Sequence, residues 1–322
     1  MRRFAAALLS LAIPVMLAAS AHGQTYPTRV IRLVCPYPPG GPADVMGRLI
    51  AQILTTSLGQ QVIVENRPGA GSTLAGREVA RAEPDGYTLL VASAATLAIG
   101  PALYKNVGYD PLTSFTPVAS FSSMPYVMIT GPKSPLRAVG DVIAQAKARP
   151  GKLNLGVPNG APPHMISVWF RDVTATDIVI VPYKGATTVV TDLISGHIDL
   201  GFEATAISLA HLHDGSLRPL GVATAQRLPE LPKVPTMIES GVPNFVVASW
   251  IGVVAPAGTP AAIVARLNAE INAGLKSPQM LARLKALAAE PRSGTPQEFA
   301  AFIATEQPKW TAMARLSNFR PE

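Results

Sequence analysis

Short apolar segments typical of β-strands alternate with helix patterns from about residue 28 to residue 241, and this alternation constrains the fold more than any other feature. In the first unit, an apolar run at 30–35 leads into a turn rich in proline and glycine at 36–44, and apolar residues then recur at helical spacing as far as Leu58. Strands that alternate with helices form mostly parallel sheets with the helices as crossovers, so the pattern predicts an α/β fold. Ligands of such folds bind beyond the carboxyl ends of the strands, where the helices begin.

Four turns between a strand and the following helix share one character: they are small or rich in glycine and proline, and they carry few charges. They lie at 36–44, 93–96, 157–164 and 182–185. The start of a helix offers unpaired N–H groups and the positive end of a dipole, which suits a bound anion. Any one such turn is more often a plain connection. Because the four occur in two separate halves of the chain, they predict two lobes that face one anionic ligand.

Signatures of common enzyme classes are missing from the sequence. There is no G-x-x-x-x-G-K-[ST], H-E-x-x-H or G-x-S-x-G pattern, and Gly69-x-Gly71 lacks a third glycine at dinucleotide spacing. His211 and His213 are two residues apart on a predicted helix, which directs them to different sides and disfavours a metal pair. Cys35 is the only thiol, and a buried, inert cysteine is the more frequent case than a nucleophile. We therefore predict a binding protein without catalytic residues, metal or cofactor.

The N-terminus predicts export. A basic start, an apolar stretch at 4–19 interrupted by Pro14, and small residues up to Gly23 are typical of a secretory signal peptide, which we assign to 1–23. Its removal leaves 25 basic against 20 acidic residues, a net charge of +5, without a basic block. This mild excess argues against nucleic acid as a partner and favours small anions. The single cysteine excludes an internal disulfide.

Several sequence blocks together resemble the substrate-binding proteins of tripartite tricarboxylate transporters, the Bug family. The resemblance runs over the whole mature chain. The blocks that carry it are Pro-Tyr-Pro-Pro-Gly-Gly-Pro-Ala-Asp at 36–44, Val-Glu-Asn-Arg-Pro-Gly-Ala-Gly at 64–71, Pro-Asp-Gly-Tyr-Thr-Leu-Leu at 84–90, Pro-Tyr-Lys-Gly at 182–185, Ala-Pro-Ala-Gly-Thr-Pro at 255–260 and Ala-Arg-Leu-Asn at 265–268.

The resemblance implies a two-lobed periplasmic binding protein, with two mostly parallel sheets, whose chain crosses twice between the lobes. The extended runs at 115–127 and 245–254 are the expected crossing strands. Lobe 1 would comprise 24–123 plus 248–322, and lobe 2 would comprise 124–247. Family members clasp small carboxylates between the lobes and deliver them to membrane permease subunits. For this chain the resemblance implies a monomer that binds a di- or tricarboxylate, an acidic amino acid or an aromatic acid.

Two departures from the family pattern affect the second lobe. Its turn usually carries serines, which are replaced here by Ala161, Pro162 and Pro163, and Glu203 stands where an aspartate is common. Loss of a hydrogen bond to a charged ligand group costs about 1.5–3 kcal/mol, so these changes bear on which carboxylate binds. His164 matches the family histidine.

The turns and the resemblance together predict a set of ligand-binding residues. The set comprises Tyr37, Pro38, Gly41, Ala43, Asp44, Ser93, Thr96, Asn159, Gly160, Ala161, His164, Tyr183, Lys184 and Glu203. Structural alternatives stay open at this stage: Asp44, Ser93 and Thr96 could cap helices, His164 could stabilise a helix end, and Lys184 could be a solvated turn lysine. Glu203 in a cleft would favour a ligand amine or hydroxyl. Functional alternatives are a sensor without a transport role and an enzyme that uses Cys35 with His164 as base.

Overall fold

The computed structural model describes residues 26–317, and it confirms the predicted alternation of strands and helices. The predicted signal peptide lies outside the described residues. The first half of the chain forms β1 (Ile31–Cys35), α1 (Pro42–Leu58), β2 (Val62–Asn66), the short helix η1 (Ala70–Ser72), α2 (Thr73–Ala80), β3 (Thr88–Ala92), the π-helix η2 (Ala95–Ile99) and α3 (Gly100–Leu103). Between residues 26 and 317, no helix is long and apolar enough to cross a membrane.

A long strand, β4 (Phe115–Thr130), then carries the chain into a second set of elements. These are α4 (Val139–Ala148), β5 (Asn154–Pro158), α5 (Pro162–Thr174), β6 (Val179–Tyr183), α6 (Ala186–Ser195), β7 (Leu200–Ala204), α7 (Thr205–His213) and β8 (Arg218–Val222). The chain returns through β9 (Ala248–Pro256) and ends with α8 (Ala261–Leu275), α9 (Pro278–Ala286), β10 (Glu290–Pro291) and α10 (Pro296–Leu316).

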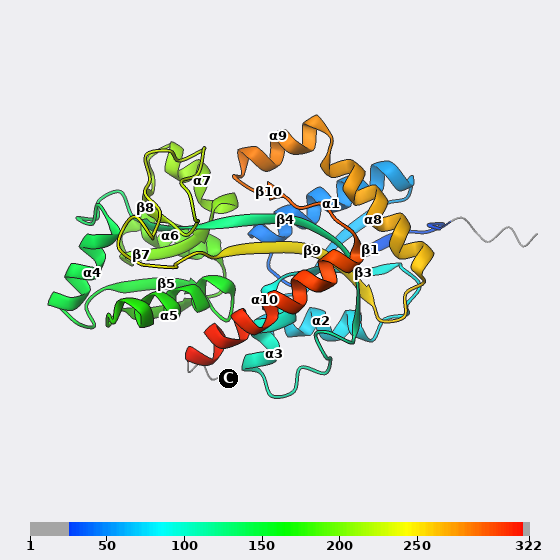
Figure 1. Ribbon diagram of the computed structural model, residues 1–322, viewed down its shortest axis with the longest axis horizontal. Helices are drawn as coiled ribbons and strands as arrows, with labels where there is room; N and C mark the ends of the chain where they lie inside the picture. The colour runs from blue at the N-terminus through cyan, green and yellow to red at the C-terminus, as the bar shows by residue number, and fades with distance from the viewer. Residues whose placement is uncertain (1–25, 318–322) are drawn as a thin grey trace, which may run out of the picture.

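The strands pair in the order β2-β1-β3-β9-β4-β7-β5-β6, with β8 and β10 paired to β4. β1 is parallel to β2 and β3, and β5 is parallel to β6 and β7, whereas β9 and β4 run antiparallel to their neighbours. Figure 1 shows the result: β4 and β9 run side by side through the middle, with α1 to α3 and α8 on one side and α4 to α7 on the other.

β4 is one continuous strand, although the local sequence pattern indicates two extended runs in succession, at 115–121 and 126–130. Residues 115–125 pair with β9, and residues 126–130 pair with β7 and β8. The β4–β9 register shifts between Pro117 and Ala119 and between Ser120 and Ser122. Such irregularities bend and twist a strand, and they accommodate a proline that cannot donate to the ladder. The change of partners near Pro125 lies close to the predicted lobe boundary at 123/124, and the boundaries themselves stay a prediction.

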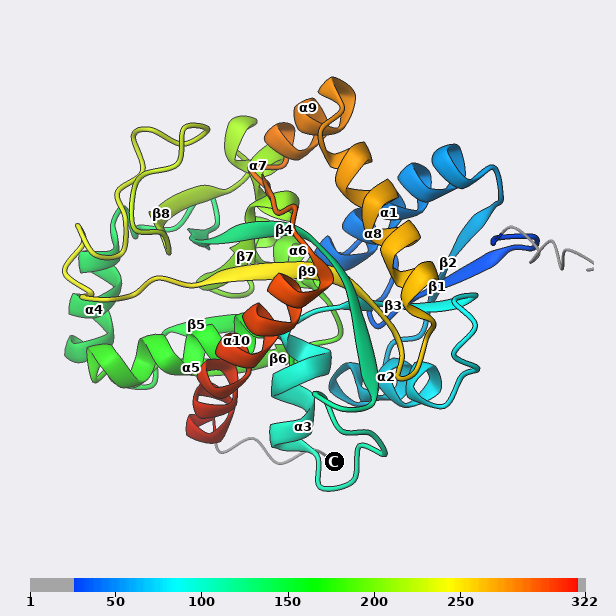
Figure 2. The same ribbon diagram turned by 45° about the vertical axis from the view of Figure 1, so that its right-hand side comes forward.

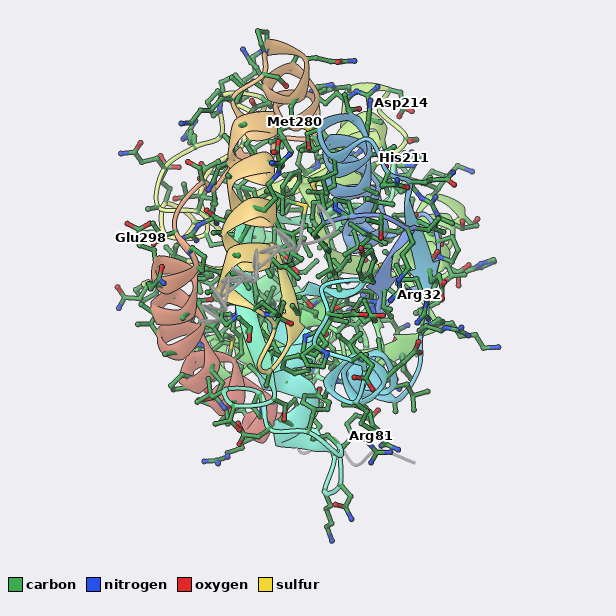
Figure 3. The ribbon with its side chains drawn as sticks, turned by 90° about the vertical axis from the view of Figure 1, so that its right-hand side faces the viewer. Arg32, Arg81, His211, Asp214, Met280 and Glu298 are labelled. Atoms are coloured by element: carbon green, nitrogen blue, oxygen red, sulfur yellow. The ribbon has the colours of Figure 1, made fainter. Side chains whose placement is uncertain are left out.

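Salt bridges fix elements of the first half, and a helix cap fixes the start of the last helix. Arg32 on β1 donates hydrogen bonds to Glu65 at 2.9 and 2.8 Å and to Glu78 on α2 at 2.8 Å, which ties β1 to β2 and α2; Figure 3 shows Arg32 beside these elements. At the start of α10, Thr295 and Glu298 cap each other's backbone N–H groups. From that start, α10 runs past the region of β4 and β9 toward α5 (Figure 2).

Candidate functional site

A cavity of about 690 Å³ is lined by residues from both halves of the molecule. Four loops supply most of its wall, within 36–43, 68–72, 158–163 and 182–187. The crossing strands β4 and β9, the ends of β3 and β7, and Tyr104 after α3 supply the rest. All four turns singled out in the sequence therefore contribute to the cavity, the one at 93–96 through Ser93 alone. Of the predicted residues, the cavity is lined by Tyr37, Pro38, Gly41, Ala43, Ser93, Asn159, Gly160, Ala161, Tyr183, Lys184 and Glu203.

Asp44, Thr96 and His164 do not line the cavity. Asp44 instead stabilises the loop at 36–43, which lines the cavity. Its carboxylate accepts hydrogen bonds from the Gly40 N–H at 3.0 Å, from Arg48 at 2.9 and 3.0 Å, and from the Asn66 amide at 2.9 Å. Asn66 also donates to the Tyr37 carbonyl oxygen at 2.9 Å. Burial opposes ionisation of Asp44, but these hydrogen bonds outweigh it and hold the pKa of the carboxyl below its usual value. The side chain thus shapes the 36–44 turn.

Replacement of Asp44 by alanine should lower the free energy of unfolding by about 2 kcal/mol at pH 7, because hydrogen bonds to a charged group are lost and the Asn66 and Gly40 donors are left without an acceptor. The folded-state pKa of Asp44 is depressed, so this stability is present above the unfolded-state value of 3.8 and is lost as pH falls below it. Urea unfolding at pH 7 and pH 3 measures the effect. Asp172→Ala, at an exposed position, is the control and should change stability by less than about 0.5 kcal/mol. An Asp44→Ala effect of equal size at both pH values would contradict this prediction.

Helix α1 presents its N-terminus to the cavity. Gly41 is the N-cap residue and Pro42 occupies the first helical position, so the next N–H groups, at Ala43 and Asp44, have no carbonyl partner one turn earlier. Gly40 has φ of +82°, a conformation that glycine adopts without strain. This arrangement leaves backbone donors and the positive end of a 17-residue helix at the cavity wall.

The starts of α5 and α6, which both line the cavity, differ in the backbone N–H groups that they leave unpaired. At α5, Pro162 and Pro163 carry no N–H, the Ala161 N–H donates to the Pro158 carbonyl oxygen at 3.2 Å, and the His164 N–H donates to the Ala161 carbonyl oxygen at 3.0 Å. At α6, the N-cap is Gly185, and the N–H groups of Ala186 and Thr187 have no intrahelical partner. Of the α5 and α6 starts, α6 is therefore the one that keeps unpaired backbone donors at the cavity.

His164 stabilises the loop before α5. Its Nδ1 accepts a hydrogen bond from the Gly160 N–H at 3.3 Å, and burial lowers the pKa of the imidazole to about 4, so the ring is neutral near pH 7. Gly160 itself has φ of +66°, which favours glycine. The Tyr183 hydroxyl donates its proton in a hydrogen bond to Asp192 at 2.6 Å, so it is not available as a donor to a ligand. Lys184 lines the cavity and is exposed to solvent. Lys184 is thus the cation of the cavity lining.

Hydroxyl groups gather where the crossing strands meet the cavity. The Tyr37 hydroxyl lies 3.4 Å from the Ser93 Oγ, and burial raises the pKa of Tyr37 to about 12 although hydrogen bonds with Ser93 and Ser72 oppose the rise. Burial likewise raises the pKa of Tyr126 on β4, which hydrogen-bonds with Ser249 of β9. All these hydroxyls are neutral at physiological pH and can donate or accept.

Among the described residues that line the cavity, only Glu203 on β7 carries a carboxyl group. Its side chain is 1% exposed, and its Oε1 has no hydrogen-bond partner among residues 26–317. Burial alone raises the pKa of this carboxyl to about 8, because no cation offsets the loss of hydration. Glu203 is therefore mainly a neutral carboxylic acid at pH 7.

The sequence did not point to several cavity residues: the segment 68–72, Tyr104, Tyr126, Ser249 and Ile251. Gly69-Ala70-Gly71 follows a strand in the same manner as the predicted turns, and this signal could have identified it. Four consecutive residues there have positive φ, from 134° at Gly69 through 46° and 59° to 77° at Ser72. Positive φ is strained at Ala70 and Ser72, and such strain is found at ligand-binding loops. Residues of the crossing strands carry no comparable turn pattern.

Cys35 lacks the properties of a nucleophile. It is fully buried in β1, and burial raises the pKa of its thiol to about 12, so the reactive thiolate is scarce at neutral pH. Among residues 26–317, no group of three or more His, Cys, Asp or Glu side chains is placed to hold a metal ion. The site offers hydrogen bonds and helix dipoles to a ligand rather than covalent chemistry.

The model of a known family, described as "Tripartite tricarboxylate transporter family receptor", matches residues 46–318. Protein BugT of Bordetella pertussis is 38% identical over 301 residues, which cover 93% of this chain and 92% of that protein. The structure of R. palustris Rpa4515 with adipate superimposes with a TM-score of 0.88 at 36% identity, over 92% of this chain and 100% of that one. The structure of MatC (Rpa3494) from Rhodopseudomonas palustris with bound malate superimposes with a TM-score of 0.84 at 31% identity. This match covers 90% of this chain and 100% of that one.

These similarities extend over nearly the whole chain and confirm the predicted two-lobed α/β architecture. The chain belongs to the receptor family of tripartite tricarboxylate transporters and is a solute-binding protein of the Bug type.

Proposed function

We propose that the protein captures a small carboxylate in the cavity between its lobes, in the periplasm, and delivers it to the membrane permease subunits of a tripartite tricarboxylate-type transporter. The observation that carries this proposal is the convergence of the α1 and α6 N-termini, one from each half of the chain, on a single cavity. Helix N-termini bind carboxylates through unpaired N–H groups and the helix dipole. The adipate and malate of the two similar structures support a carboxylate as the ligand class.

Binding from both lobes would couple capture to closure. A carboxylate held only by α1 would leave the α6 donors hydrated, and closure about β4 and β9 would bring both sets of N–H groups onto the ligand. The ligand thus stabilises the closed form by the difference between its binding free energies to the closed and the open form. The closed form would present the surface that the permease recognises.

The direct test uses the mature protein, residues 24–322, in a thermal-shift and calorimetric screen of succinate, adipate, malate, citrate and benzoate. A binding protein should show saturable stabilisation that grows with ligand concentration. Absence of any stabilisation at millimolar concentrations of all five carboxylates would contradict the proposal. Transport is tested separately, by loss of carboxylate uptake in cells that lack the protein and its return with a plasmid copy.

Ala186→Pro should weaken carboxylate binding by about tenfold or more with little change in stability. Proline at this first position of α6 removes one N–H that faces the cavity, while Gly185 before it is already extended (φ −173°, ψ 169°), as a residue before proline prefers. A hydrogen bond to a charged ligand group contributes about 1.5–3 kcal/mol. Titration calorimetry with the tightest ligand of the screen measures the loss.

The matched control is Ala261→Pro, the same substitution at the first position of α8, which does not line the cavity. Its preceding residue, Pro260, is also extended (ψ 135°). This variant should bind carboxylate like the wild type. Equal affinity of Ala186→Pro and Ala261→Pro would show that the α6 N-terminus does not contact the ligand.

A further inference from the structure

Glu203 is a buried acid in the cavity lining, and carboxylate binding by the helix N-termini does not account for its presence there. It lies on β7, where its backbone is opposite Val127 of β4, and it is a lining residue of the cavity whose Oε1 is buried and unpartnered in the part of the chain the structure describes. A buried polar atom without a partner costs free energy in the ligand-free protein. A ligand atom that completes its hydrogen bonding would remove that cost.

The groups around Glu203 do not supply a positive charge. Tyr126 of β4 interacts with Glu203, and Tyr37 of the first loop interacts with Tyr126; both tyrosines are neutral at pH 7. Of the elements that pack on β7, β5 contributes no ionisable side chain, and α5 contributes His164, which burial keeps neutral, with Arg171 and Asp172 in its last turn. α6 contributes Asp192, which is engaged by Tyr183 and His197, and α7 contributes His211 and His213 in its last turn. Glu203 therefore stays an acid with an O–H to donate.

The rest of the cavity favours negative charge. The N-termini of α1 and α6 direct positive dipole ends at it, and the exposed Lys184 adds a cation at the rim. A ligand ammonium group would be repelled by all three, and it would also require Glu203 to lose its proton in a buried place. A ligand carboxylate is favoured by all three and offers an acceptor for the Glu203 O–H.

We propose that Glu203, as a neutral carboxylic acid, donates a hydrogen bond to a second carboxylate of the ligand, so that the cavity selects dicarboxylates without an ammonium group over acidic amino acids. This inference rests on the proposed carboxylate-binding function. The proton stays on Glu203 and is shared in an O–H···O⁻ hydrogen bond, which is among the shorter and stronger kinds. The acid at position 203 is then a specificity-determining residue for the second end of the ligand.

The test is calorimetry between pH 6.5 and 9.5 with two matched pairs, succinate with aspartate and adipate with 2-aminoadipate. In the wild type, each dicarboxylate should bind at least about tenfold more tightly than its ammonium counterpart at pH 7. Above about pH 8 the dicarboxylate affinity should fall by about tenfold for each pH unit, because the binding form of Glu203 disappears.

Glu203→Gln supplies a donor that does not titrate. We expect weaker dicarboxylate binding at pH 7, because an amide N–H replaces an acid O–H, and no fall in affinity above pH 8. Glu83→Gln, at an exposed position outside the cavity, should keep the wild-type pH profile. Far-UV circular dichroism at each pH confirms that the variants stay folded.

Two outcomes would overturn the inference alone: dicarboxylate binding by the wild type that is flat or rises from pH 7 to 9.5, or an ammonium counterpart that binds as tightly as its dicarboxylate. Failure of every carboxylate to bind at any pH would overturn the proposed function and this inference with it. The two failures are therefore distinguishable.

Discussion

Glu203→Gln should raise the free energy of unfolding of the ligand-free protein by about 3 kcal/mol at pH 7 and change it little at pH 4. Burial raises the pKa of Glu203 from 4.5 to about 8, and each pH unit between these two values changes the stability difference by about 1.4 kcal/mol. Because the folded-state pKa of Glu203 is raised, the contribution of this group to the free energy of unfolding is fully present below the unfolded-state pKa of 4.5. That contribution is lost as pH rises through the folded-state pKa of about 8. Glutamine does not titrate and avoids the loss.

Urea unfolding of wild type and variant at pH 4, 6 and 8 measures this difference, which should grow with pH. The control is again Glu83→Gln, an exposed position, with less than about 0.5 kcal/mol expected at each pH. A Glu203→Gln variant that is no more stable than the wild type at pH 8 would mean that the carboxyl is hydrated or paired in the ligand-free protein. The expected result identifies Glu203 as a residue that lowers stability at the site of function.

Trp310→Ala should lower the free energy of unfolding by about 3–5 kcal/mol, the usual range for removal of a buried tryptophan. Trp310 is 0% exposed, and its indole N–H donates to Glu306 at 2.9 Å. Its helix α10 packs against η2 and β4 and also against α5 of the second half; Figures 1 and 2 show α10 between β4 and α5. Trp310 belongs to the main hydrophobic core, so the cavity left by the indole would weaken the packing of α10 on that core.

Differential scanning calorimetry should show a fall in Tm of about 6–10 °C, at about 2 °C per kcal/mol for a chain of this size. Leu316→Ala, in the last turn of the same helix, is the control because Leu316 is 46% exposed, and it should cost less than about 1 kcal/mol. Similar losses for the two variants would mean that Trp310 contributes no more than an exposed residue of α10.

Local patterns predicted the elements well where strand and helix periods were clear. The turn at 36–44 lies between β1 and α1 as expected, and the turns at 157–164 and 182–185 precede α5 and α6. The pattern was less informative on the crossing strands. β4 continues through Pro117 and Pro125, which locally favour a break, because β9, β7 and β8 pair with it on both sides of the change of partners.

The structure brings the predicted loops to one cavity and gives several of the predicted side chains other partners. Asp44 and His164 have side chains suited to a ligand, yet both satisfy backbone donors of their own loops, at Gly40 and at Gly160. Tyr126 and Ser249 have no local signal at all, because a strand residue reaches the cavity only through the packing of distant segments. Glu203 was predicted as a cleft carboxylate, but its protonation depends on burial that local sequence does not reveal.

Sequence alone was enough for the α/β class, the loops at the carboxyl ends of the strands and the family, because these follow from residue periods, turn residues and short motifs that are local in the chain. The folded structure was needed to learn which side chains meet in the cavity, which helix start keeps its donors, and which acid is neutral. Those properties depend on distances between residues far apart in the chain and on exclusion of water, and both arise when the two halves pack around β4 and β9.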